Sequence, residues 1–175
     1  QRQMCIRDSN DDDSCGLSEK ISVWLWKIGE VFMMKIVVAI DSLKGSLTSI
    51  QAGEAIEKGI KKVDLEAEVV IKPLADGGEG CLDAQTAMGK APIGVAKLAK
   101  KYGKLVLGFS GAVTKGATAC NEAGIDAYFP IVRSAVSLED AMKKKNAQEN
   151  LIDTVEQVFR VIKLSLIHIS EPTRH

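Results

Sequence analysis

Apolar runs alternate with stretches of helical periodicity from residue 34 onward. Runs rich in β-branched residues, each stopped by Asp, Gly or Pro, predict strands, because such residues suit a pleated surface and turn formers end it. Stretches with apolar residues three and four apart predict helices between the strands. This alternation is typical of βαβ units and predicts an α/β fold with an open, mostly parallel sheet. We expect strands at 35–40, 67–74, 105–110 and 126–129, and helices at 48–62, 92–102, 114–123, 138–145 and 151–162.

Several of these helices have recognisable start signals. Thr48 and Gln51 have the spacing of a capping box, in which each side chain bonds the backbone N–H of the other residue. Pro92 suits a first helical turn, since its missing N–H would be unpaired there in any case. Ser137 is a residue type that caps helices. These signals fix the beginnings of the predicted helices more firmly than their ends.

Residues 34–163 are expected to form the domain, and both ends of the chain look foreign to it. QRQMCIRDS at 1–9 and LSLIHISEPTRH at 164–175 resemble translated sequencing-library adapters. The stretch between 9 and 34 reads as upstream sequence ahead of a start at Met33 or Met34. We therefore expect no domain in 1–33 and an adapter-like tail in 164–175.

Charge and composition exclude several classes of function. The chain has 23 basic and 23 acidic residues, so it lacks the basic excess that nucleic-acid binding requires. The apolar run at 21–32 is too short and too charged to span a membrane. Both histidines, His168 and His175, lie in the tail, so histidine-based catalysis is not expected. Within the domain, Cys81 and Cys120 lack metal-ligand spacing, which predicts no zinc site or disulfide framework and a reducing cytoplasm as the location.

Acidic and glycine residues gather where two predicted strands end. Asp41 follows the first strand, and ADGGEG at 75–80 follows the second. Because ligands of open α/β sheets bind at the carboxyl ends of the strands, these two loops form the candidate site. Carboxylate oxygens bind magnesium, and glycine lets a ligand approach the backbone closely, so this combination suits a metal-bound phosphate. The alternative is a glycine-rich turn with solvated acids.

The first of these loops, DSLKGS at 41–46, opens into the helix predicted at 48–62. Its hydroxyls, its lysine and the free amides of the helix start all favour an anion, and the helix dipole adds to this effect. Phosphoryl transfer depends on this kind of positioning and charge neutralisation rather than on covalent chemistry. The alternative is an ordinary helix cap beside a solvated lysine.

Three stretches of the sequence resemble bacterial glycerate kinases. MKIVVAIDSLKGSLTS at 34–49 is similar to the amino-terminal signature of that family, and ADGGEG at 75–80 is similar to its next element. The sequence from GEGCLDAQTAMGKAP at 78–92, through IDAYFPI at 125–131 to Val161, resembles the carboxy-terminal part of the family. Nothing in the chain resembles the family's long middle portion. The resemblance implies an open, mostly parallel, flavodoxin-like three-layer domain built from both chain ends, with the family's second inserted α/β domain missing.

The two family motifs meet at a shared word. The family has Gly-Glu-Gly near each end of its chain, and Gly78, Glu79 and Gly80 serve both motifs here. A deletion at that word would retain the reading frame and leave this sequence. Cys81 then stands where the family's second motif has Arg, which removes a cation from the expected phosphate site. We therefore expect an internally truncated chain that does not turn over; the alternative is a naturally compact relative.

By resemblance, the reaction is the ATP-dependent phosphorylation of glycerate to phosphoglycerate, with Mg²⁺ as the second cofactor. Asp76 is the candidate for the acid that orients or deprotonates the glycerate hydroxyl, or holds magnesium, with Glu79 and Asp83 as alternates. Lys90 is expected to meet phosphate or the substrate carboxylate, or else to be a surface lysine. Gln85 and Thr86 match the family motif and either contact ligand or cap a helix. The implied catalytic residues are Asp76, Asp83 and Lys44; the cofactor-binding residues are Asp41, Ser42, Ser46, Gly77, Gly78, Glu79, Gly80 and Lys90; and the metal ligand is Asp76.

Known mononucleotide signatures are absent from the sequence. It contains no GxxxxGK[ST] loop, and GGEGCL lacks the third glycine of a dinucleotide-binding fingerprint. Any ATP site is therefore of another design. The competing interpretation is a non-catalytic, flavodoxin-like module that binds a ligand or regulates a partner.

Overall fold

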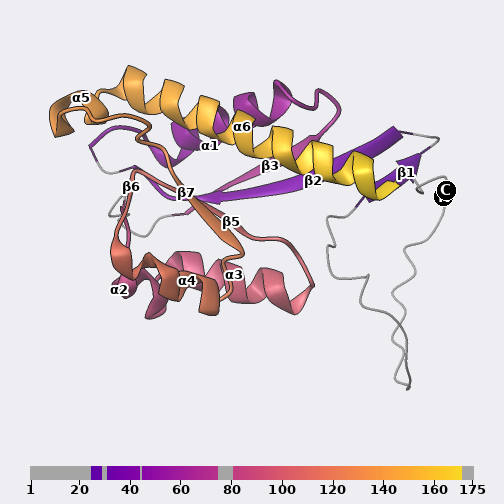
Figure 1. Cartoon of the computed structure of the whole chain (residues 1–175), viewed down its shortest axis with the longest axis horizontal. Coiled ribbons are helices and arrows are strands. Elements are labelled where there is room, and N and C mark those ends of the chain that lie inside the picture. Colours follow the sequence, from indigo (N-terminus) through magenta and orange to yellow (C-terminus); the bar gives the residue numbers. More distant parts are fainter. Residues whose placement is uncertain (1–24, 29–30, 44, 75–80, 171–175) are drawn as a thin grey trace.

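A computed structural model describes residues 25–28, 31–43, 45–74 and 81–170 of the chain. Strands and helices alternate along most of this length, as the apolar pattern predicts (Figure 1). The strands are β1 (Leu25–Ile28), β2 (Val31–Ile40), β3 (Glu68–Pro73), β4 (Cys81–Leu82), β5 (Leu107–Ser110), β6 (Ala112–Val113) and β7 (Ala127–Pro130). The helices are α1 (Ser49–Lys61), α2 (Ala84–Ala87), α3 (Ala91–Lys101), the 3₁₀ helix η1 (Lys115–Thr118), α4 (Ala119–Glu122), α5 (Leu138–Met142) and α6 (Lys144–Ser170).

Parallel pairing dominates the strands. β2 lies parallel to β3 with Ile36 opposite Val69 and Ile40 opposite Pro73. The N–H of Leu74 donates to the carbonyl of Ile40 at 2.8 Å, which carries the pairing one residue beyond β3. β4 pairs parallel with β6, and β5 pairs parallel with β7, while β1 pairs antiparallel with β2. These pairings confirm the α/β class with mostly parallel strands.

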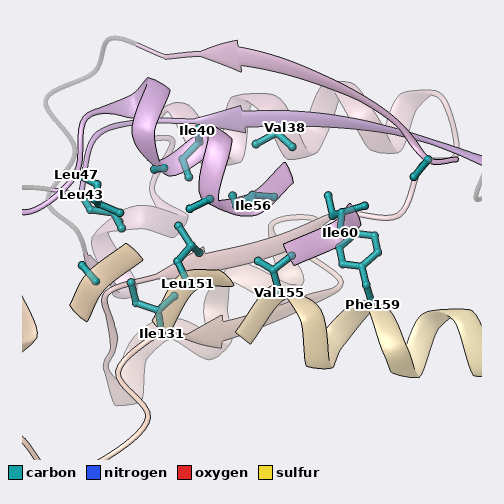
Figure 2. Close-up of a cluster of buried hydrophobic side chains, with 14 of the residues drawn as sticks. Val38, Ile40, Leu43, Leu47, Ile56, Ile60, Ile131, Leu151, Val155 and Phe159 are labelled. Carbon is teal, nitrogen blue, oxygen red and sulfur yellow. The ribbon is translucent and has the colours of Figure 1, made fainter. Parts of the chain in front are cut away.

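One hydrophobic cluster joins the early strands to the last helix, and we call it cluster 1. Figure 2 shows Leu151 and Val155 of α6 on the side that faces Ile56 and Ile60 of α1. The two helices touch most closely at Gly59, where an added Cβ would lie 2.7 Å from the carbonyl oxygen of Ile152. Cluster 1 thus depends on residues from both halves of the chain. Its buried members are Met34, Val38, Ile40, Leu43, Leu47, Ala52, Ala55, Ile56, Ile60, Ala67, Ile131, Ala147, Leu151, Val155 and Phe159.

A second, smaller cluster lies under the middle helices. Figure 1 shows α2, α3 and α4 on one side of β5 and β7, with α1 and α6 on the other side. Helices on both faces of the strands give the predicted three-layer arrangement. The stacked rings of Phe109 and Phe129, with centroids 5.7 Å apart, lie on the neighbouring strands β5 and β7. The buried members of cluster 2 are Leu82, Ile93, Ala96, Ala117, Cys120 and Ile125.

The structure departs from the sequence predictions in several elements. α6 spans Lys144–Ser170, well beyond the predicted 151–162, and its end lies in the tail expected at 164–175. β1 and the start of β2 lie within 1–33, where we expected no domain. The stretch 114–123 forms η1 followed by α4 rather than one helix, and its side chains are mostly small. β1, β4 and β6 were not predicted, because β1 lies in the stretch where no domain was expected and because β4 and β6 have two residues each, too few to show a period. The described strands form three separate hydrogen-bonded groups, so a flavodoxin-like strand order stays a prediction. No helix within the described ranges has the length and apolar character needed to cross a lipid bilayer.

Candidate functional site

The loop from Asp41 to Leu47 links the end of β2 to the start of α1. The carboxylate of Asp41 bonds within the loop, because its Oδ1 accepts the N–H of Ser42 at 2.6 Å. Thr48 then caps α1, and its hydroxyl accepts the N–H of Gln51 at 3.3 Å while the Gln51 side chain accepts the N–H of Thr48. This confirms the predicted capping box. The cap fixes the point at which the loop becomes helix.

The middle of this loop is closed by a pair of backbone bonds between Leu43 and Leu47. Each residue donates its N–H to the carbonyl of the other, at 2.9 and 3.1 Å, and the hydroxyl of Ser46 donates to the Leu43 carbonyl at 3.1 Å. Gly45 has a φ of 80°, in the region that glycine adopts without steric cost. Lys44, the predicted catalytic cation, lies outside the described residues.

The strand register places Leu74, the residue before the second predicted loop, beside the end of β2. Leu74, bonded to Ile40, is the last described residue before the segment 75–80, and Asp41 directly follows Ile40. The two loops therefore leave neighbouring parallel strands side by side, as expected for a site at carboxyl strand ends. The predicted residues Asp76, Gly77, Gly78, Glu79 and Gly80 all lie outside the described residues.

Asp83 caps the short helix α2. Its Oδ1 accepts the N–H of Thr86 at 2.8 Å and the Thr86 hydroxyl at 3.0 Å, and its own N–H donates to that hydroxyl at 3.3 Å. Thr86 is 4% exposed. Thr86 thus belongs to the cap of α2, and a ligand contact by Thr86 stays a prediction. The carboxylate of Asp83 is thus engaged in the helix cap. A catalytic role for Asp83 stays a prediction.

Lys90 lies at the residue that precedes α3, after Gly89 with a φ of 112°. The positive charge of Lys90 acts on the carboxylate of Asp83. The amide of Thr86, then its hydroxyl, and also the charge of Lys90 hold the pKa of Asp83 below its ordinary value. Asp83 and Lys90 therefore form a second group of predicted site residues, flanking cluster 2, whereas Asp41, Ser42 and Ser46 flank cluster 1.

The lowered pKa of Asp83 predicts a specific pH dependence of stability. A depressed pKa stabilises the fold above the pKa of the unfolded chain, about 3.9 for an aspartate, and the contribution disappears as the pH falls through the folded value. We expect Asp83→Asn, which keeps a capping oxygen, to lose less stability than the parent between pH 7 and pH 3. Urea unfolding at both pH values measures this difference. Equal losses in the two proteins would contradict the assignment.

Two cysteines lie in the described part of the chain, Cys81 and Cys120. Cys120 is buried, and its Sγ lies 3.7 Å from the carbonyl oxygen of Asp83. Burial first, and then the charge of Asp83, raises the pKa of the Cys120 thiol. A raised pKa favours the unreactive thiol, so Cys120 acts as a core residue. Within the described ranges, no group of three or more His, Cys, Asp or Glu side chains is placed to hold a metal.

A small polar pocket lies in the carboxy-terminal part, apart from the predicted site residues. Its volume is about 150 Å³. It shares no residue with either group described above. The lining residues are Ser134, Val136, Asp140, Ala141, Asn146, Glu149 and Asn150.

Comparison with known proteins gives one consistent family. The model of the glycerate kinase family matches residues 36–84 and 78–163. The glycerate kinase of Bacillus subtilis (strain 168) is 41% identical over 121 residues, which cover 68% of this chain and 31% of that protein. The glycerate 2-kinase of Escherichia coli (strain K12) is 38% identical over 118 residues, which cover 65% and 30%.

One solved structure is similar over part of the sequence. A crystal structure of a glycerate kinase 2 from Salmonella typhimurium LT2 is 40% identical over 33% of this chain and 16% of that chain, with a TM-score of 0.25. The chain spans about a third of the length of the curated relatives it matches. Since the family model matches most of its residues, the chain belongs to the glycerate kinase family.

Proposed function

We propose that this chain is an internal-deletion form of a glycerate kinase, an enzyme that transfers a phosphoryl group from ATP to glycerate, and that it does not turn over. The observation that carries the proposal is the overlap of the two family matches. The matched segments 36–84 and 78–163 share residues 78–84, so one stretch of this chain aligns with two places in the family. A chain that spans about a third of its relatives supports the same interpretation.

The loop Asp41 to Leu47 is proposed as the anion-binding element. It precedes α1, a helix whose first amides and dipole favour negative charge. Ser42 and Ser46 add hydroxyls, and Lys44 adds a cation. In a transfer reaction these groups would position phosphate oxygens and neutralise their charge, which is the main contribution that proteins make to such reactions.

The acids are proposed to orient the acceptor and hold the metal. Asp76 comes three residues after β3 in the sequence, and it is our candidate for the group that orients or deprotonates the glycerate hydroxyl, or binds Mg²⁺. Carboxylates at this edge fit magnesium, which prefers oxygen ligands. Bound Mg²⁺ would supply charge neutralisation. Glu79, Gly77, Gly78 and Gly80 would line the same edge.

The cap at Asp83 favours a second candidate function, a non-catalytic module that binds a ligand. A carboxylate engaged by Thr86 is less available for proton transfer, and Cys81 stands where the resemblance implies a cation. Lys90 would then serve as a binding residue only. We also propose a cytoplasmic location for either form, because the spacing of Cys81 and Cys120 is not that of a disulfide framework.

A ligand-binding and turnover experiment on the full chain separates these proposals. We expect ATP with Mg²⁺, or glycerate, to raise the melting temperature, and we expect no ATP-dependent phosphorylation of glycerate in a coupled assay. The intact Bacillus subtilis glycerate kinase is the positive control. Turnover at a rate similar to that control would disprove the loss of activity, and a thermal response to flavin alone would favour the binding module.

A further inference from the structure

A helix from the end of the chain covers the middle of the proposed anion-binding loop. A Cβ built on Gly45 would overlap the Cε methyl of Met142, the last residue of α5. Gly45 has a φ of 80° and lies between Lys44 and Ser46, two residues proposed to bind phosphate. A methyl packed against this glycine therefore limits the movement of the backbone on both sides of it.

The opposite side of the loop is already anchored. Leu43 and Leu47 are 9% and 3% exposed, belong to cluster 1 and are joined by two backbone hydrogen bonds. Met142, which is 38% exposed, touches the turn between them from outside the core. Leu43 and Leu47 thus anchor the loop in cluster 1, and Met142 contacts it at Gly45.

The helix that presents Met142 is itself held in place. The hydroxyl of Ser137 accepts the N–H of Asp140 at 3.1 Å, which caps α5. The side-chain amide of Asn146, from α6, donates to the Asp140 carbonyl at 2.8 Å. Lys143 pairs with the Asp140 carboxylate at 2.6 Å. These bonds fix α5 against the start of α6, and they therefore also fix the backbone position of Met142.

We propose that Met142 is a positioning residue for phosphate binding by the loop Asp41 to Leu47. Ordering a loop around a ligand costs free energy, and a contact that restrains the loop beforehand reduces that cost. Methionine suits the task because its unbranched side chain fits an irregular surface. This inference rests on the proposed function, since it takes a phosphate-bearing molecule as the ligand of the loop.

The test compares three variants of the full chain. Met142→Ala removes the contact, Met142→Leu retains an apolar side chain of similar size, and Leu138→Ala alters a 76% exposed residue of the same short helix. We expect Met142→Ala to speed amide hydrogen exchange at Gly45 and Ser46, with no change in the centres of α1 and α6. We also expect it to weaken the affinity for Mg²⁺-ATP, measured by calorimetry, about fivefold. The other two variants should match the parent.

The outcomes distinguish this inference from the function beneath it. If the parent chain binds neither Mg²⁺-ATP nor pyrophosphate, the proposed function and the ligand assigned to the loop are both overturned. If the parent binds and Met142→Ala binds equally well with unchanged exchange at Gly45, the positioning role alone is overturned. An equal effect of Leu138→Ala would also overturn it, because the effect would then belong to α5 as a whole.

Discussion

Replacing Leu151 by alanine is expected to lower the free energy of unfolding by about 3 kcal/mol, in the range of 2 to 5 kcal/mol found for such truncations in cores. Leu151 is 1% exposed and lies in cluster 1, between α6 and α1 (Figure 2). Its removal would leave a cavity that the surrounding helices fill only in part. Urea unfolding followed by circular dichroism at pH 7 measures the change.

Leu98→Ala is the matched control for this truncation. Leu98 is also a helical leucine, but it lies on α3 and is 60% exposed. Surface changes away from special features usually alter stability by less than about 0.5 kcal/mol. Equal losses in the two variants would mean that α6 does not pack on the core of the domain in solution.

Replacing Gly59 by alanine is expected to destabilise the protein by about 2 kcal/mol, although alanine is the better helix former. In α1, a Cβ at this position would lie 2.7 Å from the Ile152 carbonyl oxygen and 2.9 Å from the Cβ of Val155. The first of these atoms is backbone, so α6 must shift to make room. Overpacking of a core costs about 1 to 3 kcal/mol. The helix propensity gained, up to about 1 kcal/mol, offsets only part of a cost near the upper end of that range.

Gly94→Ala should have the opposite sign. Gly94 lies within α3, and an added Cβ there would meet no atom within 4 Å. Alanine should therefore raise the free energy of unfolding by about 0.5 to 1 kcal/mol, through helix propensity and the lower entropy of the unfolded chain. Thermal melts of both variants give the comparison. If Gly59→Ala stabilised the protein as Gly94→Ala does, the close contact between α1 and α6 would be wrong.

The long elements of the fold were predictable because their signals are local. The Thr48 and Gln51 capping box, the apolar stripe of α6 and the β-branched runs of β2 and β3 each lie within a few residues of sequence. The two-residue strands β4 and β6 carry no such signal. They exist because tertiary contacts bring Leu82 and Val113 together, and no period can be read from two residues.

The candidate site was predictable in outline and less so in its contacts. Asp41 and the segment after Leu74 follow neighbouring parallel strands, as residue order and the rule for carboxyl ends imply. The use of Asp83 as a helix cap was not predicted, because a capping box and a ligand motif share the same residue types. The contact between Gly45 and Met142 had no signal in the sequence, since the two residues meet only after the whole chain folds.

Cluster 1 is assembled from residues that precede Leu74 and residues that follow Cys81, and these two sets meet through side-chain packing rather than through the chain between them. A segment of any length can therefore be inserted between Leu74 and Cys81, provided that the distance between the two ends of the segment matches the distance between these two residues. This is the geometric condition under which one globular unit is inserted into another. The contact between α1 and α6 would then hold the outer domain together, whether or not a second domain is inserted into it.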